Sequence, residues 1–319
     1  MIQTFRQFGT LLGLIAIMIF FTAQLPGTFL TARNLINISQ QVSMLAVVAF
    51  AMTIVMVMRD FDLSVGSMAS LSGITAAMLF TLGFPVWQAT GIALLVGVAG
   101  GLINGILVAY VGILPFVATL GTLTVYSGLA FFISDGRTIF GRDIPAGFSG
   151  YARSGPALDA IGLEGLRLPA LTLTALAVLA AVWLLLEQTN FGRRLYAIGG
   201  NTEAARLAGI RVRRLKLAAF ALTGLGAAGA GLMYAARVAS ANPTQGAGLM
   251  LDAIAAVFLG MTMGREGEPH VLATLVGVLI LGILDNGLTQ MQVDSYIREM
   301  LIGAIVLLAV ATSSLGRRS

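Results

Sequence analysis

Residues 88–109 read QATGIALLVGVAGGLINGILVA and contain no charged residue. A helix needs about 20 such residues to cross the hydrocarbon core of a bilayer. Comparable apolar stretches lie at residues 8–25, 42–58, 65–82, 115–133, 168–187, 215–236, 250–264, 269–288 and 296–313. The pattern predicts an all-α, polytopic membrane protein with about ten transmembrane helices in a single domain, residues 1–319.

Three of these stretches leave the number of spans open. Serines interrupt the apolar character of 65–82, and 250–264 is short beyond Asp252, so nine spans or one re-entrant segment is the alternative. The first stretch follows Arg6, as in a secretory signal peptide. Residues 23–25 offer no cleavage site of the small-x-small kind, which favours a first span.

The composition excludes soluble enzymes and disulfide scaffolds. Charged residues make up 10% of the chain, against about 25% in soluble domains, and there is no cysteine. The only lysine, Lys216, stands outside any phosphate-binding P-loop motif. The only histidine, His270, cannot by itself build a zinc site or a catalytic triad, and we interpret it as a capping or snorkelling residue. The chain is therefore predicted to be no enzyme and to bind no metal or cofactor, with energy from an ion gradient or a separate ATPase.

The basic residues indicate how the chain is oriented. With the N-terminus inside, the cytoplasmic segments hold most of the 19 basic residues: Arg6, Arg59, Arg193, Arg194, Arg206, Arg211, Arg213, Arg214, Lys216, Arg265, Arg317 and Arg318. Positive charge concentrates in cytoplasmic loops, so both termini are predicted to be cytoplasmic. The net charge of +5 is then a topology signal, and no nucleic-acid partner is needed to explain it.

Two predicted loops are long. The outer one, residues 134–167, is rich in Gly and Pro with balanced charge, which favours a plain connector over a docking platform for an external protein. The inner one, residues 188–214, contains Asn201 as a helix N-cap, Glu203 in the first turn and Gly209 as a stop. This pattern predicts a short capped helix that inserts into another protein, or alternatively a surface helix stabilised by lipid head groups.

Polar and small residues within the apolar stretches suggest how the spans pack. Asp62, Ser64 and Gly66 have the pattern of an Asx-type helix cap, with direct contact to substrate or ion as the alternative, and Asp252 and Asp285 are further candidate caps. Gly97, Gly101 and Gly105 form small-xxx-small steps that favour close helix packing. GLING at 101–105 resembles GILDNG at 282–287, as expected if two five-helix halves of inverted topology are related, although chance recurrence explains so short a match equally well.

Three longer passages resemble a known family. They are DFDLSVGS at 60–67, FGRRLYAIGGN at 191–201 followed by EAARLAGI at 203–210, and LDAIAAVFLG at 251–260. These passages resemble the permease subunits of ribose-, xylose- and arabinose-type ABC importers, which are related to the branched-chain amino-acid permeases. One departure is MTMGREGEP at 261–269, where the family usually has an uncharged glycine-rich turn.

The resemblance implies a bacterial inner-membrane permease that works as a dimer of two copies. Its partners would be a cytoplasmic ATPase that holds ATP and Mg, and a periplasmic sugar-binding protein. The coupling helix that inserts into the ATPase would comprise Gly199, Gly200, Asn201, Glu203, Ala204, Ala205, Arg206, Leu207 and Gly209.

The sequence thus predicts a monosaccharide permease, with a pentose such as arabinose, xylose or ribose favoured. A sugar path needs uncharged hydrogen-bonding groups, for which the candidates are Asn104, Thr119, Thr122, Thr124 and Asn286. Structural or gating roles are predicted for Asp62, Ser64, Gly66 and Asp252. The alternatives are an ion-coupled secondary transporter and an ABC permease for branched-chain amino acids.

Overall fold

A computed structural model of the chain describes residues 2–159, 162–263 and 268–315, and the charged residues Arg265 and Glu266 lie outside these ranges. The long helices are α1 (Ile2–Gln24), α2 (Ala32–Met56), α3 (Val65–Thr81), α4 (Val86–Ile106), α5 (Pro115–Ser134), α7 (Ala170–Trp183), α10 (Val212–Val238), α11 (Leu249–Met261), α12 (Val271–Gln290) and α13 (Ser295–Leu315). The π-helical turns η1 (Leu107–Val111) and η4 (Leu184–Gln188) extend α4 and α7. The short elements are β1 (Ile139–Phe140), the 3-10 turn η2 (Gly141–Asp143), α6 (Ala146–Arg153), α8 (Asn190–Gly200), α9 (Thr202–Leu207) and β2 (Ser240–Ala241).

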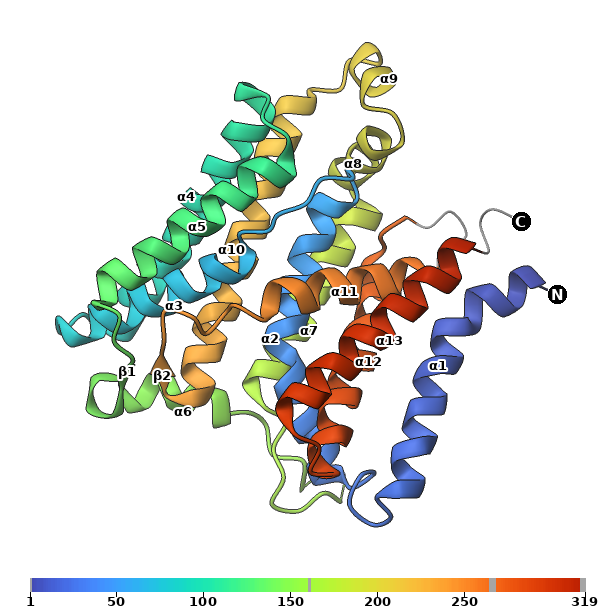
Figure 1. Ribbon diagram of the computed structural model, residues 1–319. Helices are drawn as coiled ribbons and strands as arrows, with labels where there is room; N and C mark the ends of the chain where they lie inside the picture. The colour runs from blue at the N-terminus through green and yellow to red at the C-terminus, as the bar shows by residue number, and fades with distance from the viewer. Residues whose placement is uncertain (1, 160–161, 264–267, 316–319) are drawn as a thin grey trace.

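The chain is an all-α polytopic membrane protein. Within the described ranges, six helical segments are long and apolar enough to cross a bilayer: Ala32–Met56, Val86–Val111, Pro115–Ser134, Ala170–Gln188, Val212–Val238 and Val271–Gln290. The apolar segments Gly9–Gln24, Val65–Thr81 and Leu249–Met261 are shorter. Figure 1 shows these helices as one tilted bundle, with α9 projecting at one end and β1, β2 and α6 at the other.

Helix α2 begins ten residues before the apolar stretch predicted at 42–58, because its first turns are polar. Thr31 caps the helix by accepting a hydrogen bond from the Asn34 backbone N–H at 3.2 Å. Neighbouring elements satisfy the polar side chains that follow: Gln40 Nε2 donates to the Ala152 carbonyl of α6 at 3.0 Å. A hydropathy criterion cannot detect such a helical start, because it scores the side chains and not their partners.

Helices α4 and α10 pack with almost no space between their backbones. A Cβ atom added at Gly101 would lie 2.2 Å from the Phe220 carbonyl oxygen, and one at Gly97 would lie 2.6 Å from that of Gly224. Gly105 lies in the same way against Leu217 of α10. The close packing expected for these three glycines is confirmed.

Replacing Gly101 with alanine is therefore expected to lower the free energy of unfolding by about 1–3 kcal/mol, the usual cost of overpacking. Gly91→Ala on the same helix is the matched control, because a Cβ there meets no atom within 4 Å. Denaturant unfolding of the two purified variants in detergent measures the difference. Equal stability of the two would contradict this account of the α4–α10 contact.

Irregular backbone forms two breaks between consecutive helices. The first break, residues 57–64, separates α2 from α3, and the second, residues 239–248, separates α10 from α11. The second break packs on α3, which follows the first break, and the first break packs on α11, which follows the second. The backbone N–H of Gly246 donates to Ser70 Oγ of α3 at 2.8 Å. In the reciprocal contact, the rings of Phe61 and Phe258 of α11 stack with centroids 6.2 Å apart.

The long segment at 134–167, for which the composition favours a plain connector, packs on the bundle. Its strand β1 pairs antiparallel with β2, with Ile139 opposite Ala241. The buried Phe148 of α6 packs on Phe80 of α3, with ring centroids 5.0 Å apart. The segment therefore covers the end of the bundle opposite α9 (Figure 1).

Candidate functional site

Helices α8 and α9 form the projecting end of the molecule, and both have side-chain caps at their first turns. Thr189 Oγ1 accepts from the backbone N–H of Phe191 at 3.1 Å and starts α8. Asn201 Oδ1 accepts from the Ala204 N–H at 3.0 Å and starts α9, at the position where the sequence indicates a cap. We refer to residues 189–210 as the α8–α9 segment.

The end of α9 is a Schellman turn. Gly209 has φ +83°, a left-handed conformation that costs glycine little. The Gly209 N–H donates to the Arg206 carbonyl, and the Ile210 N–H donates to the Ala205 carbonyl, both at 3.0 Å. The short helix is thus fixed at both ends by local hydrogen bonds.

Most residues predicted for coupling face outward, but two face the bundle. Leu207 is the most exposed apolar side chain of α9, at 79%. Ala205 is buried, and so is Gly199, where an added Cβ would lie 2.0 Å from the Val57 carbonyl oxygen at the end of α2. Gly199 and Ala205 therefore seat the segment on the bundle, and the remaining predicted residues form its outer surface: Gly200, Asn201, Glu203, Ala204, Arg206, Leu207 and Gly209.

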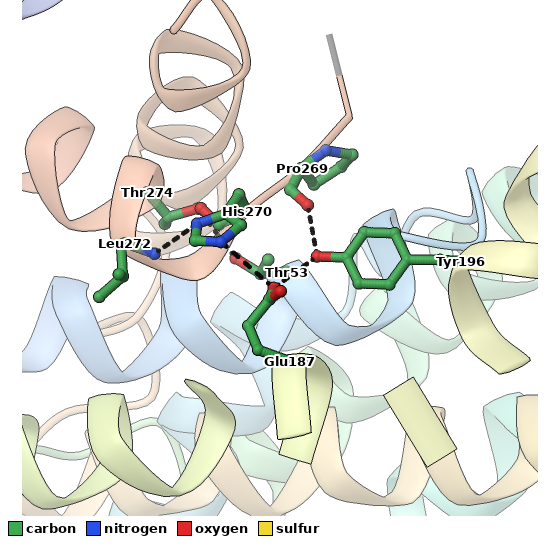
Figure 2. A network of polar contacts seen from close by, with 7 residues as sticks. All are labelled: Thr53, Glu187, Tyr196, Pro269, His270, Leu272 and Thr274. Carbon is green, nitrogen blue, oxygen red and sulfur yellow. Dashed lines mark hydrogen bonds and ion pairs between the residues drawn. The ribbon is translucent and has the colours of Figure 1, made fainter. Parts of the chain in front are cut away.

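A polar network joins the α8–α9 segment to the start of α12 (Figure 2). The Tyr196 hydroxyl lies 2.9 Å from Glu187 Oε1 and 3.1 Å from the Pro269 carbonyl oxygen. Glu187 Oε1 in turn lies 3.3 Å from His270 Nε2. Burial raises the pKa of the Tyr196 phenol and the adjacent negative charge of Glu187 raises it further, so the hydroxyl remains a proton donor.

His270 is the N-cap of α12. Its Nδ1 accepts from the Leu272 N–H at 3.2 Å, and Thr274 Oγ1 donates to its carbonyl. Thr274 also lies 3.1 Å from Thr53 of α2, oxygen to oxygen (Figure 2). The expected capping role of His270 is confirmed, and the network connects α2, η4, α8 and α12.

Four residues that the sequence analysis assigned to two different roles form one buried cluster. Asp62 Oδ1 accepts from the Ser64 N–H at 2.9 Å, which closes an Asx turn before α3, and from Ser64 Oγ at 2.6 Å. Asn104 Nδ2 of α4 lies 2.8 Å from Ser64 Oγ, and Thr122 Oγ1 of α5 donates to Asn104 Oδ1 at 2.6 Å. The cluster fixes the first turn of α3 to α4 and α5.

The other path candidates lie apart from one another. Thr119 is buried and donates to the Pro115 carbonyl of its own helix at 2.8 Å. Thr124 lies on the exposed face of α5. Asn286 Oδ1 of α12 accepts from Asn34 of α2 at 3.1 Å.

None of the five path candidates, Asn104, Thr119, Thr122, Thr124 and Asn286, lines either of the two main cavities, and their role in a sugar path stays a prediction. Thr and Asn side chains within helices form hydrogen bonds to nearby backbone or to residues they pack against. The residue type alone does not show which partner a given side chain has.

The residues predicted for gating are also separated. Gly66 is a point of close approach, because an added Cβ would lie 2.5 Å from the Gly246 carbonyl oxygen. Asp252 lies in the first turn of α11, where it lines a polar cavity. No group of three or more His, Cys, Asp or Glu residues able to hold a metal ion occurs in residues 2–159, 162–263 and 268–315.

The sequence analysis missed an ion pair between Lys216 at the start of α10 and Asp60 in the break after α2. Lys216 Nζ lies 2.7 Å from Asp60 Oδ2 and 3.0 Å from Oδ1, and the two side chains are 16% and 7% exposed. The available signal was the single lysine at the edge of a span, which needs a partner at that depth. The pair fixes α10 to the α2–α3 break.

Comparison with known proteins identifies the family. A family model described as "Branched-chain amino acid transport system / permease component" matches residues 34–310. The chain is 39% identical over 305 residues to the ribose import permease protein of Bacillus subtilis (strain 168), with 96% of this chain and 92% of the relative covered. It is 38% identical over 304 residues to the ribose import permease protein of Escherichia coli (strain K12), with 94% and 90% covered.

A second kind of relative is equally well covered. The chain is 35% identical over 364 aligned residues to the xylose transport system permease protein of Escherichia coli (strain K12), covering 98% of this chain and 93% of the relative. No solved structure matches the chain. The family resemblance carried by residues 60–67, 191–210 and 251–260 is confirmed: the chain belongs to the family of branched-chain amino acid transport system permease components.

Proposed function

We propose that this chain is the membrane-spanning subunit of an ATP-driven importer for a pentose, with ribose and xylose as the first candidates. The observation that carries the proposal is the near full-length identity of 35–39% to ribose and xylose permeases. The chain is a transport permease component rather than an enzyme. ATP and Mg would bind to the partner ATPase, and a periplasmic binding protein would deliver the sugar.

The α8–α9 segment is the proposed contact with the ATPase. Its outer surface is exposed and rigidly capped, and its inner side is seated on α2 and linked to α12 through Tyr196. An ATPase that moves between nucleotide states would displace this segment, provided that the two states bind it with different affinity. The Tyr196 network would pass that displacement to the start of α12.

The proposed topology has ten spans with both chain ends in the cytoplasm. It is supported by α1, which contacts Thr262 through Thr10 near its start and packs on Gly287 through Phe21 near its end. Helix α1 therefore runs parallel to α12, whose first residues adjoin α8. Helix α13 follows α12 and returns, so both chain ends belong to the side of the α8–α9 segment.

We also propose two inverted five-helix halves, residues 134–167 as a periplasmic segment and residues 188–214 as a cytoplasmic coupling loop. The reciprocal packing of the two breaks, Gly246 on α3 and Phe61 on α11, supports a repeat. Broken helices that meet in this way are a recurring feature of transporters built from inverted repeats. The functional unit is proposed to be a homodimer, in the bacterial inner membrane.

Uptake into proteoliposomes containing the permease, its ATPase and its binding protein tests the function. ATP-dependent accumulation of radiolabelled ribose or xylose is expected, and a protonophore should not affect it at constant ATP. Accumulation that collapses with the protonophore would indicate the secondary transporter instead. Uptake of leucine in place of either pentose would indicate the amino-acid permease.

A further inference from the structure

A polar cleft of about 380 Å³ lies between α2, α10, α11 and α12, with one contact from α13. Its volume is at the small end of the roughly 300–1,000 Å³ of ligand sites. The cleft is lined in part by polar side chains, namely Gln41, Tyr234, Arg237, Gln245, Asp252 and Asp285. Such a lining contrasts with the other main cavity, of about 830 Å³, whose lining is almost wholly apolar.

Charged side chains at this position require water or a ligand. Arg237 lies in the last turn of α10, Asp252 in the first turn of α11, and Asp285 within α12. Ionisable residues on membrane helices are costly in lipid and almost always face the protein interior or an aqueous cavity. The cleft is therefore a polar space that opens at the surface of the bundle, where Asp252 is exposed.

Some of these polar groups are already engaged. Asp285 accepts a hydrogen bond from Gln41 Nε2 at 2.5 Å and pairs with Arg298 Nε at 3.0 Å. Gln245 Nε2 donates to the Gly231 carbonyl at 3.2 Å. These groups have a structural role in the cleft wall.

Three other polar side chains in the wall are free. Tyr234, Arg237 and Asp252 make no side-chain hydrogen bond or ion pair to another residue within the described ranges. Tyr234 and Arg237 are three residues apart on α10 and so share one face of that helix. Arg237 offers the N–H donors of its guanidinium group, Asp252 offers a carboxylate acceptor, and Tyr234 offers an aromatic ring with a hydroxyl.

This set fits a small uncharged polyol. The Asp252 carboxylate can accept from two sugar hydroxyls, Arg237 can donate to hydroxyl and ring oxygens, and the Tyr234 ring offers an apolar face for sugar C–H groups. Arg237 balances Asp252, and Asp285 is paired with Arg298, so a ligand without net charge meets no unpaired charge. A metal cation would be repelled by Arg237, and a phosphate by Asp252.

We propose that this cleft is a transit site for a monosaccharide whose wall is supplied by one permease subunit, with Tyr234, Arg237 and Asp252 as the contact residues. The proposal rests on the proposed function, which supplies the substrate class. An amino-acid zwitterion also matches one base and one acid, so the test compares both ligands.

Cysteine labelling tests the site directly, because the chain has no cysteine of its own. Gly248 lines the cleft, and a Cβ added there meets no atom within 4 Å, so Gly248→Cys should fold normally. In the complete complex, a water-soluble maleimide should label this cysteine at least about threefold more slowly with saturating ribose or xylose. Leucine should leave the rate unchanged. Gly150→Cys, at an exposed position of α6 outside the cleft, is the control that no ligand should protect.

Transport by contact variants gives the second measurement. Asp252→Asn and Arg237→Gln should each lower the initial rate of pentose uptake about tenfold and abolish the protection of Gly248→Cys. ATP hydrolysis stimulated by the loaded binding protein should stay within twofold, which shows that the variants are folded. Asp294→Asn, an exposed acidic residue before α13, should transport as the unmodified chain does.

The possible outcomes separate the two proposals. Pentose transport by the unmodified complex without protection of Gly248→Cys would overturn the transit site and leave the function intact. Leucine transport with protection by leucine alone would overturn both. Normal pentose uptake by the Asp252 and Arg237 variants would overturn the assignment of the contact residues.

Discussion

Replacing Leu207 with aspartate is expected to abolish the ATP hydrolysis that the loaded binding protein stimulates in the complete complex. Leu207 is 79% exposed at the end of α9, and contact with water does not stabilise an apolar side chain. If α9 enters a groove of the ATPase, Leu207 is its apolar anchor, and anchors of this kind carry about 2 kcal/mol or more of binding free energy. A loss of that size weakens association about 30-fold. A buried, unpaired carboxylate would weaken it further.

The measurement is ATPase activity in proteoliposomes, together with retention of the ATPase on the affinity-purified permease. Leu82→Asp is the matched control, because Leu82 is 69% exposed in the turn between α3 and α4 and lies outside the α8–α9 segment. The control should retain stimulated hydrolysis. Unchanged hydrolysis with Leu207→Asp would remove the coupling role from α9. Ala205 is a poorer probe, because it is 5% exposed and a charge there would unseat the helix.

Replacing Lys216 with methionine is expected to lower the free energy of unfolding by about 3–5 kcal/mol, the usual cost of removing one partner from a buried ion pair. Asp60 is 7% exposed at its side chain and would keep its carboxylate without the ammonium 2.7 Å away. Denaturant unfolding of the purified permease in detergent measures this loss. No other substitution considered above is expected to cost as much stability.

Two further variants show whether the loss of stability comes from the broken ion pair. Asp60→Asn combined with Lys216→Met should recover most of the stability, because the double variant leaves no unpaired charge. Arg214→Met removes an exposed basic residue from the same turn of α10 and should change stability by less than about 1 kcal/mol. If Lys216→Met costs no more than Arg214→Met, the ion pair does not stabilise the fold.

The helices of this protein were largely predictable, because their length and apolar character are local properties of the chain. The predicted stretch at 115–133 corresponds to α5, and the cap at Asn201 starts α9 where expected. Helix α8 was missed because Gly199 and Gly200 at its end weaken the helical pattern. Tertiary contact explains these glycines, since Gly199 packs directly on the Val57 carbonyl.

The polar sites were less predictable, because their partners lie far away in the sequence. Asn104 belongs with Asp62, and the free Arg237 shares its cleft with Asp252 on the next long helix. A single sequence shows that each residue is polar but not which way its side chain faces. Arg237 and Asp252 stand on two different helices, α10 and α11, and only the fold brings them to one cleft.

The short ladder between β1 and β2 joins residues 134–167 to the second helix break, residues 239–248. Ile139 and Phe140 are paired with Ala241 and Ser240, which come directly before the residues leading into α11. A binding protein that displaced residues 134–167 would therefore displace this backbone as well. Docking of the loaded binding protein and rearrangement of the backbone beside Asp252 would then be directly coupled.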